Sequence, residues 1–155
     1  MHEWVQSAFG IGTENASRSG VTSTPSRGIR VLLAEDDHDV RVGLAELLAL
    51  EGYQVHAVSN GAQLLDALSS WILASQPYSA PIDVIITDVR MPGFNGLNIV
   101  EGLRASGFRQ PVVVISAFGD DAMEARIKRL PNVAFVPKPF DLKTIEDAFE
   151  SLRGT

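Results

Sequence analysis

Three observations predict an α/β fold in which a doubly wound, five-stranded parallel sheet carries helices on both faces. First, strand patterns and helical patterns alternate five times between residues 29 and 153. Second, the strand patterns are runs of consecutive apolar residues, which is typical of strands buried on both faces. Third, the helical patterns between strands suit right-handed crossovers in a parallel sheet. In sheets of this kind, ligands bind at the carboxyl ends of the strands.

The first half of this region predicts two strands and two helices. Residues 29–34 predict a buried strand, and residues 53–58 predict the second strand. Between them, apolar residues recur at helical spacing until Gly52 ends the pattern. These residues are Val40, Leu44, Leu47 and Leu48. The next helix is predicted from Asn60 to Ile72.

The second half predicts three further strands and three further helices. The strands are expected at residues 82–88, 111–116 and 133–136. Helices are expected near 97–104 and 121–130, and a last helix follows Asp141, which is a suitable N-cap. One face of that last helix carries Ile145, Ala148, Phe149 and Leu152. The expected folded domain therefore covers residues 29–153.

Residues 1–28 differ in composition from the rest of the chain. Gly, Ser and Thr dominate between Gly10 and Gly28, which predicts a flexible N-terminal tail or linker. The alternative for its beginning is a short docking helix at 3–9. Apolar side chains would lie on one side of that helix. They are Trp4, Val5, Ala8 and Phe9.

The composition excludes several classes of protein. A formal net charge of −6 disfavours direct binding to nucleic acid or to an anionic membrane. No apolar run reaches the roughly 20 residues that a membrane-spanning helix needs, and no secretory signal pattern opens the chain. The absence of cysteine excludes thiolate metal sites and thiol nucleophiles, and it agrees with a cytoplasmic location.

Four predicted strands end in residues that carry chemistry. Glu35 and Asp36 follow the first strand, Asp88 ends the third, Ser116 ends the fourth and Lys138 follows the fifth. Three neighbouring carboxylates favour a bound cation, and Mg²⁺, with Mn²⁺ as a substitute, accepts such oxygen ligands. A carboxylate flanked by a metal ion, a lysine and a hydroxyl is suited to accept a phosphoryl group. Each residue alone also has a structural explanation as a cap or turn residue.

The sequences around these residues resemble the receiver domain of two-component response regulators, the CheY-like family. The matching segments are VLLAEDD at 31–37, IITDVRMPG at 85–93, VISA at 114–117 and VPKPF at 136–140. The resemblance covers about residues 29 to 152 and implies a flavodoxin-like fold of the receiver type. It also implies a cis peptide bond between Lys138 and Pro139.

The resemblance implies that Asp88 accepts a phosphoryl group from a histidine kinase or a histidine phosphotransfer protein. Ser116 and Lys138 would bind the phosphoryl group, and Ser116 and Phe135 would form the switch. Phosphorylation would then change the protein-binding face made by the helix near 121–130, the strand at 133–136 and the last helix. Four groups would hold or orient Mg²⁺: Glu35, Asp36, Asp88 and the main-chain carbonyl of Arg90.

Several positions depart from the usual pattern of the family. Phe135 replaces a tyrosine that is often found there. Arg90 and Phe118 occupy the positions that tune hydrolysis, and bulky Phe118 is expected to slow loss of the phosphoryl group. Trp71 and Ile72 extend the second helix, either as a contact patch or as additional core.

We therefore expect a signalling switch without an attached output domain, which catalyses only its own phosphotransfer and dephosphorylation. Its downstream protein is unknown, and it would be a monomer or a phosphorylation-dependent dimer. One alternative is a receiver-like interaction module that acts without phosphorylation. An aspartyl-nucleophile phosphatase requires a second Asp at the position of Arg90, so the sequence argues against it. A flavodoxin-like nucleotide binder requires a phosphate-binding loop at the position of the acidic residues 35–37, which argues against that function too. The three histidines show no ligand spacing.

Overall fold

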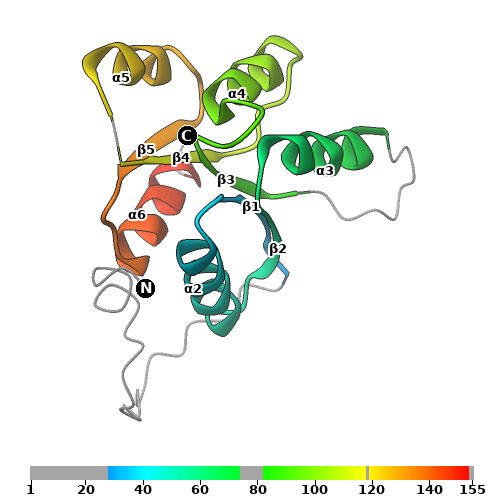
Figure 1. Cartoon of the computed structure of the whole chain (residues 1–155), viewed down its shortest axis with the longest axis vertical. Helices are drawn as coiled ribbons and strands as arrows, with labels where there is room; N and C mark the ends of the chain where they lie inside the picture. The colour runs from blue at the N-terminus through cyan, green and yellow to red at the C-terminus, as the bar shows by residue number, and fades with distance from the viewer. Residues whose placement is uncertain (1–27, 74–81, 118, 154–155) are drawn as a thin grey trace.

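The computed structural model describes residues 28–73, 82–117 and 119–153. Five strands form one parallel sheet in the order β2-β1-β3-β4-β5, so the chain reverses its winding direction next to β1 (Figure 1). This is the predicted doubly wound sheet. The strands are β1 (Arg30–Ala34), β2 (Gln54–Val58), β3 (Val84–Asp88), β4 (Val112–Ser116) and β5 (Val133–Pro137).

Helices cover both faces of the sheet. One face packs against α2 and α6, and the other packs against α3, α4 and α5 (Figure 1). The helices are α2 (His38–Leu50), α3 (Gly61–Leu73), α4 (Gly96–Ala105), α5 (Asp121–Lys128) and α6 (Leu142–Arg153). Their order along the chain places a helix between each pair of consecutive strands, as a parallel sheet requires.

Two hydrophobic cores result from the alternation of side chains along the strands. In β1, Val31 and Leu33 face α2 and α6, whereas Leu32 and Ala34 face the other three helices. All five residues of β3 and of β4 are buried, because each of these strands has neighbours on both sides. β2 lies at the edge of the sheet and is mostly exposed, so the expected burial on both faces holds only for the inner strands.

The helix starts follow the capping residues in the sequence. The side chains of Asp37, Asn95 and Asp120 accept N–H groups from the first turns of α2, α4 and α5. Asp141 behaves as predicted, because its carboxylate accepts the N–H of Thr144 at 2.8 Å. These caps fix where each helix begins at the carboxyl edge of the sheet.

Some predicted boundaries need correction by one or two residues. The second strand begins at Gln54, because the N–H of Tyr53 still bonds to the carbonyl of Leu48 and closes the preceding helix. The helix expected to reach Leu130 ends at Lys128. The predicted tail at 1–28, with its alternative docking helix at 3–9, lies outside the described residues except for Gly28. Within the described ranges, no helix combines the length and apolar character needed to cross a bilayer.

Candidate functional site

The strand register brings the four polar strand ends to one edge of the sheet. Asp88 pairs with Ile115, so Ser116 lies one residue further along the same edge. Ser116 pairs with Pro137, and the N–H of Lys138 donates to the carbonyl of Ser116 at 2.9 Å. The predicted convergence of these residues is therefore what the fold produces.

Three carboxylates meet at this edge. Oxygen atoms of Glu35, Asp36 and Asp88 all lie within 4.8 Å of one another. Glu35 is fully buried and Asp88 is 5% exposed, whereas Asp36 is open to solvent. The Nζ atom of Lys138 lies 2.8 Å from Glu35 Oε2 and 2.8 Å from Asp88 Oδ2. One ammonium group thus faces two buried carboxylates.

The start of α2 holds the acidic pair in place. The N–H of Asp37 donates to Glu35 Oε1 at 3.0 Å. The guanidinium of Arg41, one turn into the helix, donates to the carbonyl oxygens of Glu35 and Asp36 at 2.9 and 3.3 Å. Arg41 therefore binds the main chain of the acidic pair and leaves the carboxylates to Lys138 and to any cation.

The electrostatics of the site favour an additional positive charge. Burial, together with the negative charge of Asp88, raises the pKa of Glu35 to about 8, although Lys138 acts in the opposite direction. Burial opposes the charged form of Lys138, but its hydrogen bonds and ion pairs with Asp88 and Glu35 outweigh this and raise its pKa. Glu35 is therefore only partly ionised at neutral pH unless another cation joins the site.

The donor set fits a hard divalent cation. All three side chains offer carboxylate oxygens, which are the ligands that Mg²⁺ prefers. Glu35 Oε2 is buried and, among the described residues, has the ion contact with Lys138 but no hydrogen bond of good geometry. The cleft beside Asp36, about 500 Å³, is lined by the loop at 89–95 and gives access from solvent.

Two glycines that the sequence did not single out shape the loop after Asp88. A Cβ atom on Gly96 would lie 2.0 Å from the carbonyl oxygen of Asp88 and 2.7 Å from Thr87 Oγ1. A Cβ atom on Gly61, at the start of α3, would lie 2.4 Å from Cβ of Phe94. The loop that connects β3 to α4 is thus closely packed at both ends. Glycines near helix starts are common, so the sequence alone gave no reason to select these two.

Three of the four residues expected to form the switch or to tune hydrolysis are described, and they lie around the same edge. Ser116 is buried, and Phe135 is half-buried against the core beneath α5. The Phe135 ring lies against Gly119, where a Cβ atom would come within 2.9 Å of its Cζ atom. Arg90 is exposed and pairs with Asn95 through the main chain, and its N–H donates to Asp88 Oδ1 at 3.1 Å. Phe118 lies outside the described residues.

Two smaller expectations also have clear outcomes. The peptide bond between Lys138 and Pro139 is cis, as the resemblance implied. His38 and His56 are exposed and stand apart from the acidic cluster, and His2 lies outside the described residues. Within the described ranges, the acidic triad is the one group of metal-ligating side chains close enough to share an ion.

Comparison with known proteins gives consistent matches to one family. The chain is 29% identical over 119 residues to sporulation initiation phosphotransferase F of Bacillus subtilis, covering 77% of this chain and 89% of that protein. It is 34% identical over 126 residues to the transcriptional regulatory protein QseB of Escherichia coli O157:H7, covering 80% of this chain but only 52% of QseB. Thus the chain spans about half the length of that second relative.

A solved structure agrees on the fold. The receiver domain of the Francisella response regulator 1452 superposes with a TM-score of 0.67 at 21% identity, covering 81% of this chain and 98% of that one. Residues 31–150 match the family described as response regulator receiver domain. These residues include every strand end that forms the acidic site. The chain therefore belongs to the response regulator receiver domain family.

Proposed function

We propose that the protein is a phosphorylation-dependent signalling switch whose acceptor is Asp88. The single observation that carries this proposal is the environment of the Asp88 carboxylate. It ends β3 beside two other carboxylates, and Lys138 lies 2.8 Å from its Oδ2 atom. An ammonium at this distance neutralises charge that would otherwise repel an incoming phosphoryl group.

The phosphodonor would be a phosphohistidine on a kinase or on a histidine phosphotransfer protein. A carboxylate oxygen of Asp88 attacks the phosphorus atom while the bond between that phosphorus and the imidazole nitrogen breaks. The electron pair of the broken bond remains on the imidazole, which takes a proton from water. An acyl phosphate then stands on Asp88, and Lys138 and the Ser116 hydroxyl are the groups of this chain that would bind its oxygens.

We propose that Glu35, Asp36, Asp88 and the main-chain carbonyl of Arg90 hold or orient Mg²⁺ or Mn²⁺. A bound divalent ion would neutralise negative charge on the carboxylates and on the phosphoryl oxygens. The raised pKa of Glu35 supports this, since burial and the nearby Asp88 make a metal-free site short of positive charge. The ammonium of Lys138 and the N–H of Arg90 would position the Asp88 carboxylate for the reaction.

The proposed switch couples Ser116 to Phe135. Both side chains lie on neighbouring strands, and Phe135 packs beside Gly119 in the loop that follows Ser116. Movement of the Ser116 hydroxyl toward a phosphoryl group would draw this loop away from the Phe135 ring. The ring could then turn inward and change the face formed by α5, β5 and α6. A downstream protein, or a second copy of the chain, would bind that face.

The protein would not act on other substrates: it would catalyse only its own phosphotransfer and dephosphorylation, in the cytoplasm. Arg90 and Phe118 would set the rate of dephosphorylation. The direct test of the function is phosphotransfer profiling with purified histidine kinases and phosphotransfer proteins, in Mg²⁺ and in a chelator. Rapid labelling by at least one donor is expected, and Asp66→Asn on the exposed side of α3 is the matched control. A chain that takes no label from any kinase or small acyl phosphate would instead act as an interaction module.

A further inference from the structure

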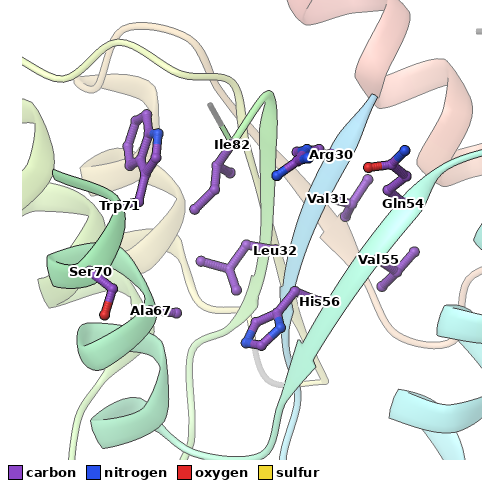
Figure 2. A pocket seen from close by; sticks show the side chains of 10 residues that line it. All are labelled: Arg30, Val31, Leu32, Gln54, Val55, His56, Ala67, Ser70, Trp71 and Ile82. Atoms are coloured by element: carbon purple, nitrogen blue, oxygen red, sulfur yellow. The ribbon is translucent and has the colours of Figure 1, made fainter. Parts of the chain in front are cut away.

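A groove of about 580 Å³ lies between α3 and the strands β1 and β2. Figure 2 shows Leu32, His56 and Ile82 directed from the strand side toward α3, where Ala67 and Trp71 face them. The groove begins at Arg30, the first residue of β1, whereas the acidic site follows the last residue of that strand. Since a strand of five residues is roughly 17 Å long, the groove is separate from the acceptor site.

We propose that this groove binds residues 3–9 of the same chain as a short amphipathic helix. The proposal does not depend on phosphorylation of Asp88. In a helix, Trp4, Val5, Ala8 and Phe9 would lie on one side, and Glu3, Gln6 and Ser7 would lie on the other. A helix of seven residues is marginal by itself in water, so this pattern requires a surface to pack against.

The groove offers the chemistry that this segment needs. Leu32, Ala67, Trp71 and Ile82 supply apolar surface, and the ring of Trp71 is only partly buried although it packs 5.8 Å from the ring of Phe108. The exposed edge strand β2 leaves this surface open on one side. Aromatic side chains such as Trp4 and Phe9 would bury the largest apolar area there.

Charge supports the same pairing. Arg30 supplies a positive charge to the lining of the groove, and no acidic side chain of the described residues lines it. Glu3 is the one charged residue between positions 3 and 9. Its place on the polar side of the helix would bring it toward the rim of the groove. The attraction would be modest, because pairs at an exposed rim are screened by solvent.

The length of the connecting chain allows this contact within one molecule. Residues 10–29 join the segment to Arg30, which itself lines the groove. A chain of 20 residues rich in Gly and Ser has a typical end-to-end distance of roughly 25 Å. This length allows residues 3–9 to reach the groove, because the chain is attached at Arg30 on the groove itself. Gly28 lies against Gln54, another residue of the groove, so the chain enters the domain beside the proposed binding surface. A tether of this length gives residues 3–9 an effective concentration at the groove on the order of millimolar.

Paramagnetic broadening of amide NMR signals can test the contact in the full chain. The sequence has no cysteine, so Ser7→Cys provides a single attachment point for a nitroxide on the polar side of the segment. We expect selective loss of amide signal intensity at His56, Ala67 and Ser70. The loss should disappear in the double variant Trp4→Ser, Phe9→Ser, and it should remain in Gln6→Ser.

A pair of variants on α3 tests the surface itself. Ser70→Phe would fill the groove from an exposed position and should abolish the broadening, whereas Ser69→Phe, its exposed neighbour outside the groove, should leave it intact. Three results would overturn the proposal. These are broadening centred on another face, broadening that survives Trp4→Ser, Phe9→Ser, and broadening seen only between molecules in a mixture of isotope-labelled and spin-labelled chains.

Discussion

Replacing Asp88 by Asn should remove phosphorylation while leaving the stability of the metal-free protein nearly unchanged. The change removes an attraction to Lys138 at 2.8 Å, which is about 6 kcal/mol at an effective dielectric constant of 20. At about pH 9, where Glu35 is ionised, it also removes the repulsion by Glu35 at no more than 4.8 Å, which is about 3.5 kcal/mol or more on the same scale. Exposed Asp36 adds a smaller repulsion that water screens.

At that pH, these opposing contributions predict a net change of less than about 2.5 kcal/mol in the free energy of unfolding. By contrast, removing one partner of an isolated buried ion pair costs about 3–5 kcal/mol. Urea unfolding in a chelator at about pH 9 distinguishes the two cases, with Asp66→Asn as the exposed control. Saturating Mg²⁺ should stabilise the parent protein by about 2.7 kcal/mol at a hundredfold excess over Kd, and should stabilise Asp88→Asn much less.

A loss of more than about 3 kcal/mol in the chelator would contradict this prediction, because Asp88 would then act as an ordinary ion-pair partner of Lys138. An equal response of both proteins to Mg²⁺ would remove Asp88 from the metal site.

Three further predictions concern the same edge of the sheet. Gly96→Ala should destabilise the protein by about 1–3 kcal/mol in urea unfolding, because its Cβ would meet the Asp88 carbonyl, whereas Gly102→Ala in the open part of α4 should be neutral or stabilising. In metal-free buffer, the free energy of unfolding should fall as pH rises from 5 toward about 8, because the folded-state pKa of Glu35 lies above its unfolded value of 4.5. The free energy of unfolding of Glu35→Gln should not show this decrease with pH. Lys138→Met should lower the phosphotransfer rate at least tenfold, and an unchanged rate in stopped-flow assays would contradict a role of Lys138 in phosphotransfer. Mg²⁺ should stabilise this variant more than the parent protein, because two buried carboxylates would have lost their cation.

The sequence was sufficient to predict which side chains would meet, and the reason is geometric. Parallel strands all end at the same edge, so Glu35, Asp88, Ser116 and Lys138 had to converge once the alternation of strands and helices was recognised. The contacts of Lys138 with two carboxylates followed from the same placement.

Features that depend on close approach between distant segments could not be predicted in this way. Gly61 is required by Phe94, which lies more than 30 positions later in the sequence. Arg41 belongs to no motif that the sequence shows, yet its guanidinium donates hydrogen bonds to the main-chain carbonyls of Glu35 and Asp36. The exposure of β2 depends on its edge position, which a local pattern of Val55 and Val58 does not reveal.

The sequence also overstated the length of the helix that ends at Lys128. Leu130 continues its apolar pattern, but the chain leaves the helix and the carbonyl of Pro131 accepts a hydrogen bond from Arg104 instead. Arg104 is almost fully buried and also donates to the carbonyls of Phe108, Gln110 and Asn132. A charged residue that stabilises four loop carbonyls in this way has no local signature in sequence.

Locating the modified residue after phosphorylation tests whether Asp88 is the acceptor. The full chain is incubated with a small acyl phosphate and Mg²⁺, the product is reduced with borohydride, and the modified residue is located by peptide mass spectrometry. We expect one modification, on Asp88, that is absent in Asp88→Asn and in the presence of a chelator. Modification at another residue, or undiminished modification of Asp88→Asn, would contradict it.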